Sequence, residues 1–87
     1  MMNAILLHKM DNVVTVTETV PAGGAAVYFL DGIEKKEIAV QEIPQFHKIA
    51  LSPIARGEAV IKYGETIGYA TRDILRGQHV HTQNMDS

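Results

Sequence analysis

The sequence contains no cysteine and no tryptophan, and only 6% of its 87 residues are aromatic. Without cysteine, the chain has no disulfide framework, no thiolate ligands for zinc or an iron–sulfur cluster, and no nucleophilic thiol. Any metal ion must therefore be bound by histidine or by oxygen ligands. Because a chain this short buries only a modest fraction of its surface, we expect one domain over residues 1–87 with a single small core.

Positive charge is also scarce, since eight lysines and arginines are set against ten acidic residues, for a net charge of −2. The cations are scattered along the chain, so no nucleic-acid partner is expected. The longest apolar runs, at residues 4–7 and 25–30, are far shorter than the roughly 20 residues that cross a bilayer, so no membrane partner is expected. His8, Lys9 and Asp11 interrupt the first apolar run before it reaches the length of a signal peptide, and we expect a cytoplasmic protein.

β-branched side chains dominate the first third of the chain. Residues 12–21 contain four valines and three threonines, a density that is typical of a strand. A second apolar run, residues 25–30, ends at Asp31-Gly32, a dipeptide suited to a tight turn, after which residues 33–40 can pair back. The pattern predicts a β-hairpin whose second strand carries its charges on the surface.

A short motif recurs along the chain. Its copies lie at residues 20–23, 43–49, 54–60 and 74–80. We interpret the motif as a corner: an apolar residue anchors it in the core, glycine supplies a positive φ, and a later apolar residue enters the next strand. In the copy at 43–49, Phe46 stands where the other copies have glycine.

Short strands joined by such corners predict a compact all-β domain whose strands bend from one sheet to the next. Residues 63–65 predict one more turn. Helix is limited to single turns near residues 52–55 and 71–75, the first of which begins with a serine before a proline, a typical helix start.

The sharpest chemical feature is the segment His79-Val80-His81. Two histidines at i and i+2 of an extended segment project to one face, so both imidazoles can converge on a metal ion or an anionic ligand, while Val80 points into the core. The alternative is a half-exposed terminal strand on which polar residues simply alternate with Val80. A closed metal site needs a third ligand, and His47 lies in a comparable setting at a corner, its alternative being an exposed loop histidine.

Other polar residues are weaker candidates. They are Lys48, Lys62, Tyr63, Tyr69, His8 and Asp11. A lone lysine can bind a carboxylate or phosphate but is usually solvated, the rings more often pack, and the aspartate suits a turn as well as catalysis. The sequence has no glycine-rich phosphate loop and no Gly-x-Ser-x-Gly elbow, so no catalytic residue is assigned and a complete active site on this chain alone is not expected.

Five short segments, taken together, carry a resemblance to a known family. In order, they are Asp11-Asn12-Val13-Val14, His47-Lys48-Ile49-Ala50-Leu51, Val60-Ile61-Lys62-Tyr63-Gly64, Ile67-Gly68-Tyr69-Ala70 and Gly77-Gln78-His79-Val80-His81-x-x-Asn84. The set covers nearly the whole chain and resembles the N-terminal SAF domain of the altronate and galactarate dehydratase family. This resemblance implies a β-clip fold, an SAF-type arrangement that agrees with the corner-rich pattern.

The resemblance also implies a partner. In single-chain members of that family the domain precedes a much larger catalytic region, whereas in related two-subunit lyases, including sulfolactate sulfo-lyases, it stands alone as the small subunit. A chain of 87 residues with its own Met1 fits the second arrangement. We therefore expect the non-autonomous small subunit of a carbon–oxygen lyase, with a large catalytic subunit as its partner, or else the N-terminal domain of such an enzyme. In isolation, the uncovered strand edges predict a homodimer.

The chemistry that the resemblance implies is hydro-lyase action on a sugar acid. A proton is removed next to a carboxylate and water is lost from the β-carbon, assisted by a divalent metal, typically iron(II), at a site shared with the large subunit. Position by position, the resemblance implies metal ligands at His47, His79 and His81. It implies substrate contacts at Lys48 and Asn84.

One departure from the family pattern affects His47. The family usually has glycine immediately before the His-Lys pair, whereas this chain has Phe46, and phenylalanine does not readily adopt a positive φ. Either this corner has an ordinary φ, or His47 is displaced from the position that the family gives it.

Two other functions stay open. Residues 64–70 resemble the sugar-acid dehydratases more than the sulfo-lyases, but the alpha subunit of a sulfolactate sulfo-lyase is an alternative. SAF-type domains also serve as non-catalytic carbohydrate-binding or assembly modules. The segment His79-x-His81-x-x-Asn84 favours an enzyme, because a binding or assembly module has no need of it.

Overall fold

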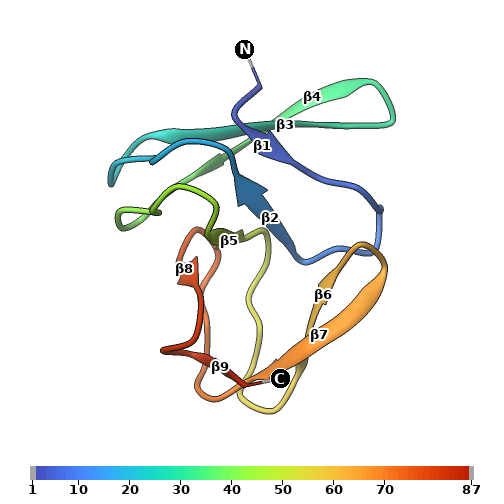
Figure 1. The fold of residues 1–87 in the computed structure, drawn as a ribbon, viewed down its shortest axis with the longest axis vertical. Coiled ribbons are helices and arrows are strands. Elements are labelled where there is room, and N and C mark those ends of the chain that lie inside the picture. Colours follow the sequence, from blue (N-terminus) through green and yellow to red (C-terminus); the bar gives the residue numbers. More distant parts are fainter. Residues whose placement is uncertain (1, 87) are drawn as a thin grey trace.

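The computed structural model describes residues 2–86, and this part of the chain is built from short strands without a helix (Figure 1). In chain order the strands are β1 (Ala4–Ile5), β2 (Val13–Val16), β3 (Ala25–Leu30), β4 (Ile33–Ile38), β5 (Lys48–Ala50), β6 (Ala59–Lys62), β7 (Glu65–Ala70), β8 (His79–Val80) and β9 (Met85–Asp86). The predicted all-β class is confirmed. Over the same residues, no helix is long and apolar enough to cross a membrane.

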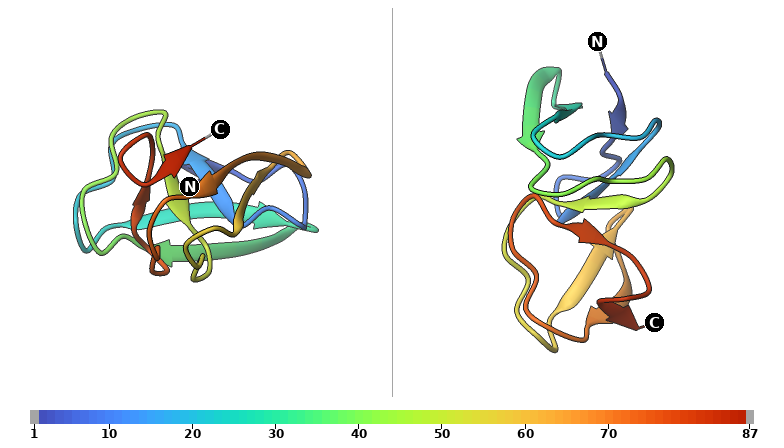
Figure 2. Two further views of the ribbon diagram at one scale, coloured as in Figure 1. Left: turned by 90° about the horizontal axis from the view of Figure 1, so that it is seen from below. Right: turned by 90° about the vertical axis from the view of Figure 1, so that its left-hand side faces the viewer.

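The centre of the molecule is a four-stranded antiparallel sheet in the order β1-β2-β5-β8. The hairpin β3–β4 and the three-stranded sheet β6-β7-β9 lie at opposite ends of it, as the side view in Figure 2 shows. The central sheet therefore joins strands from three distant parts of the chain, namely β2, β5 and β8.

Two groups of buried side chains form the core, one toward each end of the molecule. The upper core in the view of Figure 1 contains Ala4, Val14, Val16, Val20, Ala26, Tyr28, Ala39, Ile43 and Ile49. The lower core contains Val13, Ala50, Ile54, Val60, Ala70, Ile74 and Val80. The single core expected from chain length is thus wrong, because Val13 and Val14 of β2 point to opposite faces and both faces are covered. For the same reason β2 has no alternation of polar and apolar residues.

The repeated motif forms four corners of one kind. In each, the fourth residue of the motif has a positive φ and the following N–H donates back across the turn, which is the pattern of a type II turn. These hydrogen bonds run from Gly24 to Pro21, His47 to Pro44, Glu58 to Ala55 and Gln78 to Leu75, at 2.8–3.1 Å. The apolar residues that begin the motifs pair as two isolated bridges, Val20 with Ile43 and Ile54 with Ile74, so the corners come in two couples.

The predicted turn at Asp31-Gly32 is confirmed, since β3 and β4 meet there with φ values of 51° and 77°. Consecutive positive φ values are the mark of the hairpin turn that matches strand twist. One expectation about this hairpin is wrong: Glu37 of β4 is buried rather than on the surface, because Arg76 from the fourth corner pairs with it.

The single helical turns expected near residues 52–55 and 71–75 do not form. Both segments are bends that lead into the bridge between Ile54 and Ile74, whose N–H and C=O groups exchange hydrogen bonds of 2.8 Å. Because both isoleucines are buried in the lower core, burial keeps the chain extended where the serine–proline signal favours a helix.

Candidate functional site

His47 directly follows the second corner and precedes β5. Phe46 adopts a φ of 66°, in the same left-handed region as the glycines of the other corners. The first of the two alternatives, an ordinary φ at this corner, is therefore wrong, and a displacement of His47 from its position in the family stays a prediction. The N–H of His47 donates to Pro44 at 3.0 Å, and its carbonyl accepts from Val16 at 2.9 Å, so the backbone of His47 is fixed from both sides.

His79 begins β8 and His81 follows it, next to β5 in the central sheet. Val80 between them is fully buried in the lower core, and the prediction that it points inward while the two histidines share a side is confirmed. The pairing of Ile49 with His79 brings the C-terminal histidines to the start of β5, where His47 lies. Residues more than 30 positions apart thus meet at one sheet edge.

The three imidazoles form what we call the histidine cluster: His47, His79 and His81. The ring of His47 stacks on that of His81 with centroids 3.8 Å apart, and it lies 5.0 Å from the ring of His79. All three side chains are half-buried. The alternatives of an isolated loop histidine and of a merely alternating strand do not describe this arrangement.

A chain of hydrogen bonds sets which nitrogens carry protons. The side-chain N–H of Gln83 is 3.1 Å from Nδ1 of His79, and Nε2 of His79 is 2.8 Å from Nδ1 of His47. Because an amide N–H can only donate, Nδ1 of His79 accepts, so its proton is on Nε2 and is donated to His47. In neutral His47 the proton is then on Nε2. Gln83 is not among the site residues that the sequence predicts, and its place four residues after His79 is the one sequence signal for this contact.

Asn84 closes the turn that follows β8. Its Oδ1 accepts the N–H of His81 at 3.0 Å, and its Nδ2 donates to the carbonyl of His79 at 2.8 Å. The side chain is buried, with 6% of its surface exposed. Both polar ends are used inside the turn, so Asn84 positions the two histidines, and a substrate contact by Asn84 stays a prediction.

Burial and neighbouring positive charge favour the neutral imidazoles. The pKa of His79 lies below its usual 6.5, first because of burial and then because of His47, His81 and Lys48. The pKa of His81 is lowered by burial and then by His47 and Lys48. Since both values fall below 6.5, these two rings are neutral at pH 7 and can accept a proton.

As they lie, the three rings do not fit one metal ion. A metal lies in the plane of each imidazole that binds it, but these planes are within 16° of parallel and two rings are stacked face to face. Within residues 2–86, no three histidine or acidic side chains converge as a metal site. One atom is nevertheless unexplained: Nδ1 of His81 is buried without a hydrogen-bond partner in the described chain. The metal ligands assigned from the resemblance stay a prediction.

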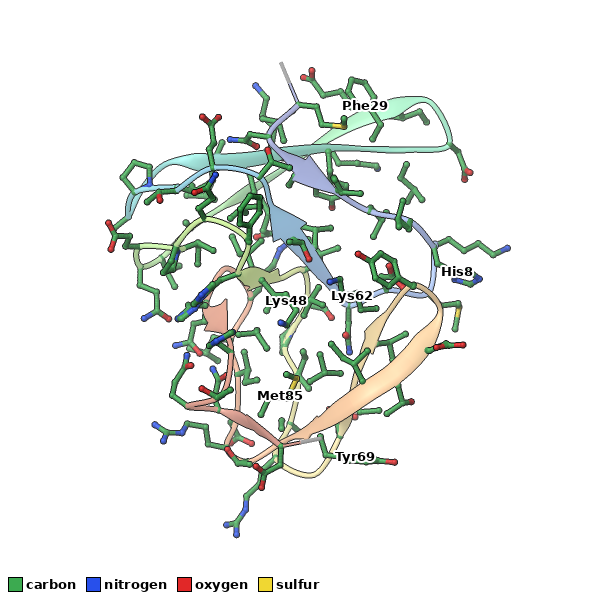
Figure 3. All side chains as sticks on the ribbon, in the orientation of Figure 1. His8, Phe29, Lys48, Lys62, Tyr69 and Met85 are labelled. Carbon is green, nitrogen blue, oxygen red and sulfur yellow. The ribbon has the colours of Figure 1, made fainter. Side chains whose placement is uncertain are left out.

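Two lysines lie beside one another on the face shown in Figure 3. Lys48 belongs to β5 and Lys62 ends β6, and both side chains are half-buried. Burial, followed by the charge of Lys62, lowers the pKa of Lys48. The ammonium of Lys62 lies 4.5 Å from the ring centroid of Tyr63, a cation–π distance.

The remaining weak candidates lie outside the histidine cluster. Asp11 is buried and accepts the N–H groups of Tyr63 and Gly64 at 3.0 and 2.8 Å, so it holds a turn, as one of its two interpretations predicts. His8 accepts the N–H of Met10 and packs against Gly64. Tyr69 is 54% exposed on β7 (Figure 3).

The histidine cluster lies outside the two hollows described for residues 2–86. The two hollows described in residues 2–86, of about 320 and 290 Å³, are lined by residues 6–9 with 29–31 and by residues of the third and fourth corners. None of the cluster histidines and neither lysine lines them. A small molecule bound here would therefore need a second surface to cover it.

Comparison with known proteins places the chain. It matches the family described as the altronate/galactarate dehydratase SAF domain over residues 2–87. The chain belongs to this family. Altronate dehydratase of Bacillus subtilis is 36% identical over 84 residues, which are 97% of this chain and 16% of that protein. Altronate dehydratase of Escherichia coli is 40% identical over 91 positions, covering 95% of this chain and 16% of that protein.

This SAF domain also resembles a separate subunit. The alpha subunit of (2R)-sulfolactate sulfo-lyase from Chromohalobacter salexigens is 34% identical over 84 aligned positions, covering 92% of this chain and 89% of that subunit. The SAF domain therefore spans about one sixth of the altronate dehydratases that it matches but nearly all of the sulfo-lyase alpha subunit.

Proposed function

We propose that this SAF domain supplies the histidine cluster and Lys48 to a hydro-lyase site for a sugar acid, and that a larger catalytic region completes the site. The observation that carries the proposal is the cluster itself: three imidazoles from two distant corners meet on an open surface. The dehydratases named above support the reaction class, and the domain spans only 16% of their length.

The surface position of the cluster favours a shared site. Two of its rings are neutral at pH 7, and Nδ1 of His81 has no partner within the described chain. Such an atom costs free energy unless another group reaches it. Because the chain itself covers this nitrogen, a facing catalytic region would reach it only by shifting the rings, and its direct effect would be to exclude water from the cluster.

The role of this chain in the reaction is to accept a proton from the substrate. The carbon next to the carboxylate of a sugar acid loses its proton to a base while hydroxide leaves the β-carbon. A neutral imidazole is suited to accept that proton near pH 7, and a positioned base contributes about 10²–10⁴-fold to the rate. The ammonium of Lys48 binds the carboxylate and stabilises the negative charge that develops on it.

A divalent metal would add Lewis-acid stabilisation of that charge. Because the stacked rings do not fit a three-histidine metal site, we assign no step of the proposal to it. Its ligands are expected chiefly from the larger region. Metal content, measured with and without the SAF domain, tests this assignment.

The proposal is tested in the assembled enzyme. The tagged chain is used anaerobically, with iron(II) present, to retain its large partner, and the complex is assayed on altronate, galactarate and sulfolactate. Where the catalytic region continues the same polypeptide, that polypeptide is assayed. His81→Gln is expected to lower kcat at least a hundredfold, because a lost general base costs about 10²–10⁴. His79→Gln, which removes the hydrogen bond that orients His47, is expected to lower kcat by a smaller factor. His8→Gln, outside the cluster, is the matched control.

The outcomes separate three functions. Turnover of a sugar acid that depends on the cluster supports the dehydratase. Turnover of sulfolactate alone supports the sulfo-lyase alpha subunit, which the 89% coverage of that relative favours as the second candidate. If both histidine variants turn over as fast as the His8→Gln control, the domain is a binding or assembly module and the proposal is wrong.

A further inference from the structure

Lys48 and Lys62 place two positive charges together in a half-buried setting. β6 is held against the start of β2 by Asn12, whose side chain bonds the carbonyl of Ala59 and the N–H of Ile61 at 3.0 and 2.8 Å. β5 pairs with β2 directly, and Lys48 lies opposite Thr15. The two lysines therefore approach each other because β2 binds both of their strands.

Within the described residues, neither lysine forms an ion pair with an acidic group. The ion pair found within residues 2–86 joins Arg76 to Glu37, on other elements. Glu65 is opposite Lys62 in the β6–β7 register, yet the structure shows no ion pair between them. Two ammonium groups that are partly removed from water and lie beside one another (Figure 3) cost free energy in the folded chain.

A second observation lies at the same place. Oγ1 of Thr15, the residue opposite Lys48, is buried and has no hydrogen-bond partner in the described chain. A threonine hydroxyl reaches a new acceptor by rotation about one bond. The two ammonium groups can only donate, which suits an oxyanion, and the Thr15 hydroxyl, now covered by the chain, would add a third donor once its side chain turns outward.

We propose that Lys48 and Lys62 together bind one carboxylate group of the sugar acid, at the edge of the histidine cluster. The cluster is near because Lys48 directly follows His47 and lies opposite Val80, between His79 and His81, in the β5–β8 register. Tyr63 holds the ammonium of Lys62 by its ring face. A carboxylate with two oxygens can accept one hydrogen bond from each lysine. This inference rests on the proposed function for the identity of the ligand.

Binding to the chain itself tests the inference without any turnover. The chain, with isotopically labelled lysine side chains, is titrated with galactarate and with galactitol, the uncharged alcohol of the same carbon skeleton, and the shifts are followed by NMR. We expect saturable shifts of the Lys48 and Lys62 signals with galactarate only. Lys62→Gln and Lys48→Gln should each weaken binding about tenfold, the effect of losing one charge-assisted hydrogen bond. Lys35→Gln, on exposed β4, is the matched control.

The lysine site and the proposed function can be overturned independently of each other. If galactarate shows no saturable binding up to its solubility limit, if galactitol binds equally well, or if Lys62→Gln binds like the Lys35→Gln control, the lysine site is wrong. An assembled enzyme that turns over sugar acids would still support the proposed function in each case. Conversely, lysine-dependent binding by a chain whose complex is inactive supports the site and overturns the hydro-lyase assignment. Amide spectra of each variant show that the fold is retained.

Discussion

At the scale of the residue, Phe46 shows how far a local rule extends. A left-handed φ costs a residue with a Cβ roughly 1–2 kcal/mol, and the three sister corners avoid this cost with glycine. Phe46 adopts the conformation nevertheless and keeps 68% of its surface exposed. The corner is imposed by the bridge from Val20 to Ile43 and by the hydrogen bonds around His47, which do not depend on the side chain at 46. The rule that phenylalanine avoids a positive φ is sound as a preference, but it does not predict the φ that Phe46 adopts in this corner.

The histidines show what residue spacing can predict. The i, i+2 rule correctly predicted that His79 and His81 lie on one side and that Val80 between them is buried. It could not predict ring stacking, because stacking depends on side-chain torsions and on His47, which arrives through a strand pairing. Gln83 was missed for the same reason, since its contact with His79 exists only in the folded turn.

Replacing Gln83 should therefore change the tautomer of His79. In Gln83→Ala, the amide no longer donates to Nδ1, so the proton of His79 is expected to distribute between its two nitrogens rather than stay on Nε2. Nitrogen-15 NMR of the imidazoles measures this directly at pH 7.5. Thr82→Ala, the exposed neighbour, is the control. An unchanged pure Nε2–H form in Gln83→Ala would show that the amide does not set the tautomer.

At the scale of the element, each hairpin is fastened by one asparagine. Asn3 binds the N–H of Val27 and the carbonyl of Ala25, and Asn12 binds Ile61 and Ala59 in the same manner. Each side chain thus acts as one extra residue of a strand ladder. The prediction of the first hairpin rested on its Asp31-Gly32 turn, which is local. The turn does not predict that Asn3, 22–24 positions away, also holds the hairpin through hydrogen bonds.

Removing the Asn12 side chain should loosen the β6–β7 hairpin. Asn12→Ala leaves the N–H of Ile61 and the carbonyl of Ala59 unpaired, which is expected to lower the free energy of unfolding by about 2 kcal/mol. Urea denaturation measures the change. The control is Gln45→Ala, which removes one exposed hydrogen bond of 3.3 Å and should cost well under 1 kcal/mol. Equal losses in the two variants would contradict the role given to Asn12.

The missing helical turns belong to the same scale. The signal at residues 52–55 is real as a local preference, because serine before proline suits a helix start. Two buried isoleucines that pair across the lower core override it. Tertiary burial outweighs a preference of a few tenths of a kcal/mol, and a sequence window of four residues cannot contain the partner 20 positions away.

At the scale of the whole molecule, the fourth corner joins the two cores. Gly77 lies so close to β4 that a Cβ there would be 2.5 Å from the carbonyl of Ile38, and its own carbonyl accepts from Val40 at 3.0 Å. Next to it, Nε of Arg76 donates to both oxygens of Glu37, at 2.9 and 3.0 Å. The Glu37 side chain is 7% exposed and the Arg76 side chain 64%. The charge pattern of β4 suggested a solvated face and gave no sign of this pair, because the cation comes from 39 positions away.

Breaking this pair should destabilise the folded chain. Arg76→Gln leaves the buried carboxylate of Glu37 without its cation, and we expect the free energy of unfolding to fall by about 1–2 kcal/mol, at the lower end for a charged hydrogen bond because the arginine is mostly in water. Adding Glu37→Gln should restore part of the loss, since the buried charge is then absent. Full additivity of the two substitutions in urea denaturation would show that the pair is not coupled.

Arg76→Gln should also change how the stability of the chain depends on pH above 10. Burial and the charge of Glu37 raise the pKa of Tyr28 above 10, and Arg76 lowers it again, so Arg76→Gln should raise the pKa of Tyr28 further. A tyrosine whose pKa is higher in the folded chain than in the unfolded chain loses its favourable contribution as pH rises from 10 through the folded value. Stability should therefore fall across that range, and more steeply in Arg76→Gln. Tyr28→Phe removes the titrating group, and an unchanged slope in that variant would assign the pH dependence to other residues.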